Sequence, residues 1–175
     1  MRSLVRRFGK LRLRINESKS TVDWAWKRPF LGLAFWRGSG RKVSVRIAGE
    51  SLAAMKNRVR TLTRRMRGRS LDCVVADLRA FLVGWKGYFG LADTPSVFRE
   101  LDHWIRHRLR AYQLKQWKRP RTVFRELKAR GMSDYHAASV AAHTGRWWHA
   151  SAISAIHIAL PNAFFDGMGV PRLAP

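Results

Sequence analysis

The side chains in this sequence that could do chemistry are mostly arginines and lysines in two stretches. In residues 56–67, half of the twelve positions are basic: Lys56, Arg58, Arg60, Arg64, Arg65 and Arg67. Residues 97–119 repeat the pattern with Arg106, Arg108, Arg110, Lys115, Lys118 and Arg119. The planar guanidinium group donates forked hydrogen bonds that match phosphate oxygens. We therefore expect phosphate contacts here, and the simpler alternative is a solvated charged face.

Patterns for catalysis or metal binding are weak. His103 and His107 lie one helical turn apart and could hold a metal, but no glutamate stands between them in the His-Glu-x-x-His manner and no third ligand is evident. Contacts to phosphate or to a helix end explain the pair more simply. Asp77 and Asp93 lack the partner of a catalytic carboxylate pair. We expect no catalytic residue, no resident metal and no cofactor.

The overall charge indicates a polyanionic partner. The 175 residues include 35 Lys and Arg against 11 Asp and Glu, a net charge of +24. Residues 1–130 hold 33 of these basic and 9 of these acidic residues, so the whole excess lies there and residues 131–175 are neutral. An excess of one sign repels itself unless a polyanion neutralises it. Nucleic acid is the first candidate, before a membrane surface or an acidic protein.

Composition also indicates what kind of core the protein can form and in which compartment it should fold. Hydrophobic residues make up 46% of the chain, which is enough for a packed core that should take most of the eight Trp. Cys73 is the single cysteine, so neither an internal disulfide nor a cysteine-rich zinc site can form. The N-terminal residues lack the apolar stretch of a signal peptide, and no apolar run is long enough to span a bilayer. We expect a cytoplasmic protein without a membrane partner.

The first 50 residues show patterns typical of strands. Residues 11–15 alternate apolar and basic side chains, as a half-buried strand does, and residues 16–20 are typical of a turn. Two more strands are expected at 30–36 and 42–47, joined by a glycine-containing turn at 38–40.

From Ser51 onward the apolar spacing becomes helical. Ser51 should cap a helix that runs to residue 67, a second helix should follow Ser70, and a long third helix should run over 97–119 until Pro120 stops it. Three amphipathic helices on short connections predict a small bundle. Shorter helices are expected after it, at 121–130, 133–143 and 147–160.

Two motifs near the N-terminus resemble elements of group II intron reverse transcriptases, which also act as maturases. Asn16-Glu17-Ser18-Lys19-Ser20 is similar to the family's Asn-x-x-Lys-Ser/Thr element. Phe30-Leu31-Gly32-Leu33 resembles the Phe-Leu-Gly-Phe strand at the junction of palm and thumb.

Further motifs follow in the family's order. Gly84-Trp85-x-x-Tyr88-Phe89 resembles an element of the maturase-specific region. The stretches around Trp104 and Trp117 are similar to the long helix after it. The family's C-terminal block is matched by Gly145-Arg146-Trp147, by residues 159–162 and by Gly167.

The resemblance implies a mainly α fold in three parts. Residues 1–50 would be the end of a palm-like region, with short strands in a hairpin. Residues 51–120 would form a three-helix, thumb-like bundle with the maturase-specific region. Residues 121–175 would be the small helical C-terminal part of the maturase domain, often called domain X.

The resemblance also implies a function. Members of the family bind their intron RNA, stabilise its folded core for RNA splicing, and copy it during retrohoming as mobile genetic elements. For this chain it implies an RNA-binding maturase-type module whose partner is structured RNA, in particular group II intron RNA, with a DNA target as a further candidate. The twelve basic residues named first would then be its RNA-binding residues.

Two features of the family are not found in this sequence: the Tyr-Ala-Asp-Asp motif of the polymerase and the endonuclease with its His and Cys ligands. The chain should therefore not be catalytic alone, and Lys19 would have no leaving pyrophosphate to assist. Mg²⁺ would serve only if a separate fingers–palm polypeptide completed a polymerase. Such a split reverse transcriptase is the first alternative, and a non-functional remnant is the second.

Overall fold

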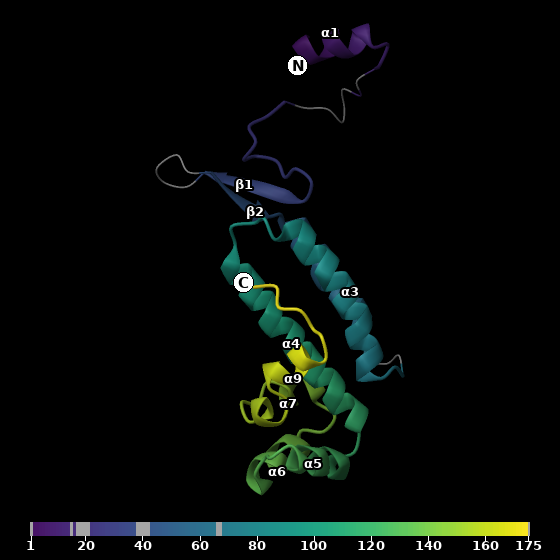
Figure 1. The fold of residues 1–175 in the computed structure, drawn as a ribbon, viewed down its shortest axis with the longest axis vertical. Helices are drawn as coiled ribbons and strands as arrows, with labels where there is room; N and C mark the ends of the chain where they lie inside the picture. Colours follow the sequence, from purple (N-terminus) through teal and green to yellow (C-terminus); the bar gives the residue numbers. More distant parts are fainter. Residues whose placement is uncertain (1, 15, 17–21, 38–42, 66–67, 175) are drawn as a thin grey trace.

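The computed structural model describes residues 2–14, 16, 22–37, 43–65 and 68–174. Within these ranges the chain is mostly helical, with a two-stranded antiparallel hairpin early in the chain (Figure 1), so the predicted mainly α fold is confirmed. The elements in chain order are α1 (Arg2–Lys10), β1 (Leu33–Arg37), β2 (Val43–Ile47), α2 (Gly49–Leu62), α3 (Leu71–Phe89), α4 (Pro95–Trp117), α5 (Pro120–Ala129), α6 (Asp134–Ala142), α7 (Trp147–Ala150), α8 (Ile156–Ala159) and α9 (Asn162–Gly167).

The strand predicted at residues 11–15 is wrong. The chain turns directly after α1, where the N–H groups of Leu11 and Leu13 both donate to the carbonyl of Phe8. Arg12 has a φ of 56°, in the left-handed region, which an extended strand does not contain. Leu11 and Leu13 are exposed, so there is no core here for an alternating pattern to face. The turn predicted at 16–20, with Lys19, lies outside the described residues except for Asn16.

The predicted β-hairpin is present, but its first strand begins later than expected. Leu31 and Gly32 have φ values of 50° and 76°, so the chain turns there and β1 starts only at Leu33. The antiparallel register places Leu33 opposite Ile47, which is buried at the edge of the core. The turn predicted at 38–40 lies outside the described residues.

Two polar residues attach this hairpin to the helices. The carboxylate of Asp93, between α3 and α4, accepts a hydrogen bond from the N–H of Val45 (3.2 Å), and the N–H of Asp93 donates to the carbonyl of Val45 (2.8 Å). The hydroxyl of Ser51 donates to the carbonyl of Gly32 (3.0 Å). Ser51 therefore does not cap α2 as predicted, and the helix begins earlier, with Ala48 in the N-cap position.

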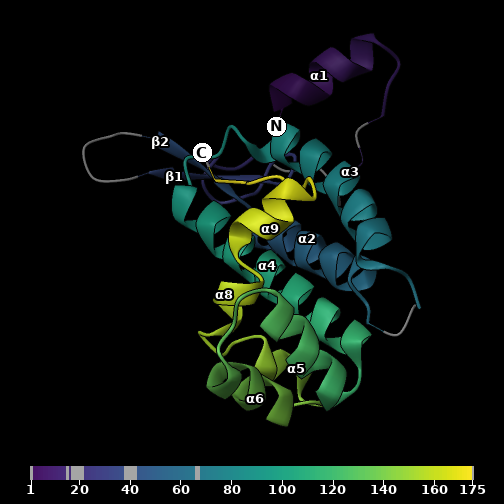
Figure 2. The same cartoon turned by 60° about the horizontal axis from the view of Figure 1, so that its bottom comes forward.

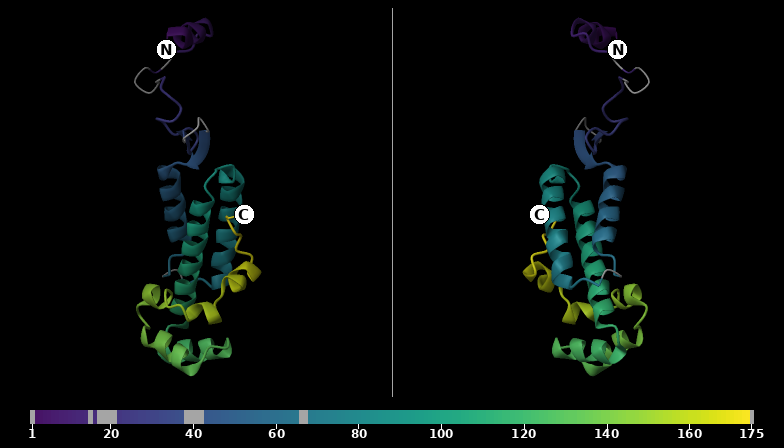
Figure 3. Two further views of the ribbon diagram at one scale, coloured as in Figure 1. Left: turned by 90° about the vertical axis from the view of Figure 1, so that its left-hand side faces the viewer. Right: turned by 90° about the vertical axis from the view of Figure 1, so that its right-hand side faces the viewer.

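The three long helices α2, α3 and α4 lie side by side (Figures 2 and 3), as the bundle prediction required. Their apolar stripes meet in one core, in which Val59 of α2, Leu82 of α3 and Leu109 of α4 are fully buried. α2 ends at Leu62 instead of residue 67, and this shortening places its last arginines in a connecting segment.

Short helices follow the bundle. The predicted helices at 121–130 and 133–143 are confirmed as α5 and α6. The single helix predicted at 147–160 is wrong, because turns separate α7 from α8. The hydroxyl of Ser151 donates back to the carbonyl of Trp148, and the N–H groups of Ala152 and Ile153 bond three residues back instead of four.

The chain then returns along α4 (Figure 1, yellow). Phe165 of α9 is buried in the core of the long helices, together with Val170 and Leu173 of the last segment. The neutral C-terminal quarter thus covers a side of α4 that a bundle of three helices alone would leave open.

Candidate nucleic-acid interface

Four of the predicted arginines are exposed on α2 and just after it. Arg58 and Arg60 project from the helix, and Arg64 and Arg65 follow its end. Lys56 is half-buried, and Arg67 lies outside the described residues. The apolar stripe of α2 faces the core, so Arg58 and Arg60 occupy the remaining arc of the helix.

Where the α2–α3 connection passes the end of α4, a surface groove of about 380 Å³ opens. We call it the basic groove, and its lining residues are Arg65, Gly68, Arg69, Ser70, Tyr112, Lys115, Gln116 and Lys118. The groove brings together basic side chains that are far apart in the sequence. Arg119, which was predicted with them, is exposed beyond the groove at the start of α5.

Hydrogen bonds from α4 hold the shape of the basic groove. The hydroxyl of Tyr112 and the side-chain amide of Gln116 each donate to the carbonyl of Arg69, both at 2.7 Å. The hydroxyl of Ser70 accepts from the N–H of Cys73 and so caps α3, the helix that was predicted to follow it. The positive end of α3 therefore faces the groove from a fixed position.

The charge of the groove is largely unneutralised. Arg69 forms an ion pair with Asp77, and the hydrogen bond in that pair raises the pKa of Arg69. No acidic residue is among the described residues that line the groove, and Arg65, Lys115 and Lys118 form no ion pair within the described part of the chain. Such a site suits groups with concentrated negative charge, and phosphate is the commonest of these.

Sequence reasoning missed Arg69. The available signal was its place directly before Ser70, because a residue that precedes an N-cap lies at the positive end of a helix.

Trp104 of α4 lies near two arginines, one from α2 and one from α4. The guanidinium groups of Arg60 and Arg108 lie 5.6 Å and 5.3 Å from the centre of its ring. Arg108 also donates from Nε to the hydroxyl of Thr63 (2.7 Å) at the end of α2. Burial lowers the pKa of Arg108, and the charges of Arg65 and Arg60 lower it further. Arg108 thus joins α4 to α2 and is only partly open to a ligand.

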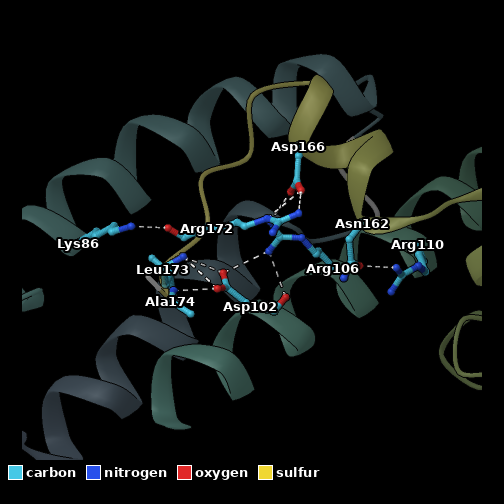
Figure 4. Close-up of polar contacts among 9 residues, drawn as sticks. All are labelled: Lys86, Asp102, Arg106, Arg110, Asn162, Asp166, Arg172, Leu173 and Ala174. Carbon is cyan, nitrogen blue, oxygen red and sulfur yellow. Dashed lines mark hydrogen bonds and ion pairs between the residues drawn. The ribbon is translucent and has the colours of Figure 1, made fainter. Parts of the chain in front are cut away.

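Two of the predicted RNA-binding residues, Arg106 and Arg110, are not on a free surface. Each is only 2% exposed. Arg106 donates to the carboxylates of Asp102 (3.2 Å) and Asp166 (2.5 Å), as Figure 4 shows. Arg110 donates from Nε to the carbonyl of Leu160 (2.8 Å) and from Nη2 to Asn162 (2.7 Å).

These contacts hold the C-terminal segment against α4 (Figure 4). Asp102 also accepts hydrogen bonds from the backbone N–H groups of Leu173 and Ala174, and Arg172 forms a second ion pair with Asp166. Burial lowers the pKa of Arg110 to about 10, with a smaller effect from the neighbouring charge of Arg106. Arg106 and Arg110 were expected to be exposed because the prediction considered only the long helices. It did not include the C-terminal segment that packs over these two residues.

The motif residues that carry the family resemblance are mostly packing residues. Trp85 is buried, and its ring lies 4.8 Å from that of Phe89. The hydroxyl of Tyr88 donates to the carbonyl of Leu31 (2.9 Å). A Cβ atom at Gly32 would lie 2.6 Å from the Ser51 hydroxyl and 3.3 Å from the Phe89 ring, so only glycine fits there. The Phe-Leu-Gly and Gly-Trp-x-x-Tyr-Phe motifs therefore meet in space.

The remaining motif residues have separate surroundings. Trp117 lies under the guanidinium of Arg130 (4.9 Å), and Trp147 lies under the ammonium of Lys115 (5.6 Å). Asn16 is exposed. Nothing in the structure explains glycine at position 84, since a Cβ atom there would meet nothing within 4 Å.

His103 and His107 do not form a metal centre with a third ligand. Within the described ranges no group of three or more His, Cys, Asp or Glu side chains could hold a metal ion. The Nε2 atom of His107 lies 3.1 Å from the carbonyl of Trp148, and the two rings stack at 3.8 Å. His107 therefore fixes α7 to α4, while His103 is exposed.

These features define a helical module with an unneutralised basic groove. The family model of the group II intron maturase-specific domain matches residues 52–132, which include every residue that lines the groove. Residues 52–132 are thus similar to this domain, as the motifs predicted, and the match does not favour the split-polymerase alternative. No curated protein matches the chain. Among the described helices, none combines the length and the apolar character needed to cross a membrane.

Proposed function

We propose that the chain binds structured group II intron RNA through the basic groove and the exposed arginines of α2, and that this binding supports splicing and mobility of the intron. The observation that carries the proposal is the groove itself. Its cations come from both the α2–α3 connection and α4, and hydrogen bonds to the carbonyl of Arg69 hold the two parts together. A preformed cluster of cations costs little to arrange when phosphate binds.

The surroundings of the groove favour a long polyanion over a small anion. The exposed residues Arg58, Arg60 and Arg64 extend the positive surface along α2. At about 1.5 Å per residue, the 14 residues of this helix span roughly 21 Å, which several successive phosphates of one strand could occupy. Folded RNA is recognised largely through its shape and its backbone, and a rigid helical surface suits that task.

Binding measured against salt concentration tests the proposal. The variant Arg65→Ala/Lys118→Ala removes two groove cations, and Arg7→Ala/Lys10→Ala removes the same charge from α1, well away from the bundle (Figure 1). For the parent, the logarithm of affinity should fall steeply with the logarithm of salt concentration. The groove variant should lose about one unit of slope for each phosphate contact removed. The α1 variant should keep the parent's slope.

Equal losses in the two variants would show that net charge alone causes binding and would contradict the groove. A duplex DNA of equal length tests a DNA target with the same proteins. In these measurements Mg²⁺ is expected to act by folding the RNA, because the proposal assigns the protein no cofactor of its own.

A further inference from the structure

A second pocket lies on a different side of α4, between that helix and the α7–α8 segment. Its volume is about 650 Å³. The side chains that could bind a ligand there include three imidazoles, His103 and His107 from α4 and His157 from α8, and the guanidinium groups of Arg99 and Arg110. The proposed RNA groove does not account for this gathering of basic groups, and packing of the later segments accounts only for Arg110 and His107.

The donor set of the pocket suits an anion better than a cation. Three imidazoles could suggest a metal, yet they are not placed to share one, since the described residues contain no group of three potential ligands that could hold an ion. Glu100 is the one acidic residue among the described residues that line the pocket. Imidazolium and guanidinium groups are hydrogen-bond donors without free acceptor atoms. The pocket is therefore rich in donors, and it loses acceptor atoms as its imidazoles take up protons.

Two of the basic groups that line the pocket are held in place before any ligand binds. Arg110 is only 2% exposed, and its bonds to the carbonyl of Leu160 and to Asn162 fix the plane of its guanidinium group. The ring of His107 is fixed by its contact with the carbonyl of Trp148 and by stacking on the Trp148 ring. A rigid set of donors is what binding of a small, highly charged group requires.

Charge favours the same ligand. Burial lowers the pKa of His157, and the neighbouring charges of Arg110, His103 and His107 lower it further. Burial is also the main cause of the lowered pKa of His107. Both imidazoles therefore give up their protons at a lower pH than usual while the pocket is empty, and an anion bound beside them would draw the protons back.

We propose that this pocket binds a phosphate group, with Arg99, Arg110, His103 and His157 as donors and with Trp104 at its edge. The group could belong to an RNA strand or to a free nucleotide. RNA as the source rests on the proposed function, whereas the phosphate site itself does not.

The test follows the imidazole resonances of the whole chain by NMR, with inorganic phosphate as the first probe. The signals of His103 and His157 should shift and saturate, whereas that of His136, exposed on α6, should not. Because a bound anion favours the protonated imidazole, the His157 resonance should titrate at a higher pH with phosphate bound than in the empty pocket. In His103→Gln/His157→Gln the affinity should fall roughly a hundredfold, about tenfold for each of the two charge-assisted hydrogen bonds that are lost. The control variant His136→Gln should bind as the parent does.

Further arms separate the sources of the phosphate. A short RNA with a 5′-phosphate is compared with the same RNA ending in a 5′-hydroxyl. Shifts with both assign the pocket to the RNA backbone, shifts with the first alone assign it to a strand end, and shifts with inorganic phosphate but neither RNA assign it to a free phosphate. Shifts of His103 and His157 no larger than that of His136 would overturn the site. The groove measurement is separate, because Arg65→Ala/Lys118→Ala should leave these phosphate shifts unchanged.

Discussion

The variant Arg106→Met tests whether Arg106 stabilises the fold or contacts RNA. Its position in a basic helix suggested an RNA contact. The substitution removes the ion pairs to Asp102 and Asp166, whose side chains are 15% and 24% exposed. Breaking a buried ion pair at one partner typically costs about 3–5 kcal/mol. For Arg106→Met we expect a cost at the low end of this range, because Arg172 still pairs with Asp166 and the backbone N–H of Leu173 still donates to Asp102.

A second effect reduces this cost. The Nε atom of Arg106 is buried with no hydrogen-bond partner among the described residues, a penalty of about 1–3 kcal/mol that Met does not carry. We therefore expect a net loss of about 2 kcal/mol in the free energy of unfolding. For a chain of this size that loss lowers Tm by roughly 4–8 °C. The control Arg58→Met, at an exposed site on α2, should stay within about 0.5 kcal/mol of the parent.

The same interaction gives a pH dependence of known sign. Burial alone would raise the pKa of Asp166, but hydrogen bonds from Arg106 and Arg172 outweigh it, so the pKa lies below its ordinary value. The resulting stability is present above the pKa of the unfolded state, about 3.9, and is lost as the pH falls through the folded value. In thermal melting, the Tm of the parent should fall between pH 7 and pH 3 as this stabilisation is lost. The Tm of Arg106→Met should fall less over the same range. An unchanged Tm together with weaker RNA binding would refute the structural role.

Two further outcomes are expected. Trp85→Ala should cost about 3–5 kcal/mol in thermal melting, because its buried ring packs against Phe89 and Phe98, whereas Trp148→Ala at an exposed ring should cost much less. The purified chain should show neither primer extension nor nuclease activity with Mg²⁺ or Mn²⁺, since its described residues place no carboxylate cluster for the metals. Metal-dependent extension that copurifies with the chain would contradict this.

The long helices could be predicted from the sequence because their signals are local. The apolar spacing of Val59, Leu82 and Leu109 places each of them on a buried stripe, and all three are buried. The helix predicted to follow Ser70 begins at Leu71, directly after it. Alternation alone misled at residues 11–15, because a strand also needs a partner strand and a core to face.

The roles of the arginines could not be predicted in this way. Arg106 and Arg110 differ from Lys115 and Lys118 only in what covers them. The covering residues Asn162 and Asp166 lie more than 50 positions later in the chain. Helical periodicity identifies which side chains share a face, but it does not show whether a distant segment will pack on that face.

Four of the basic residues in and directly after α4 form two pairs with opposite environments. Arg106 and Arg110 lie beneath the C-terminal segment, where they are almost fully buried and bond to a carboxylate and a carbonyl of that segment. Lys115 and Lys118, nearer the end of the helix, line a groove without a carboxylate. Part of the net charge of +24 therefore serves packing instead of binding. It follows that substitutions at the two sets should act on different measurements, melting for the first and the salt dependence of RNA binding for the second, so total charge is a poor guide to the RNA surface of this protein.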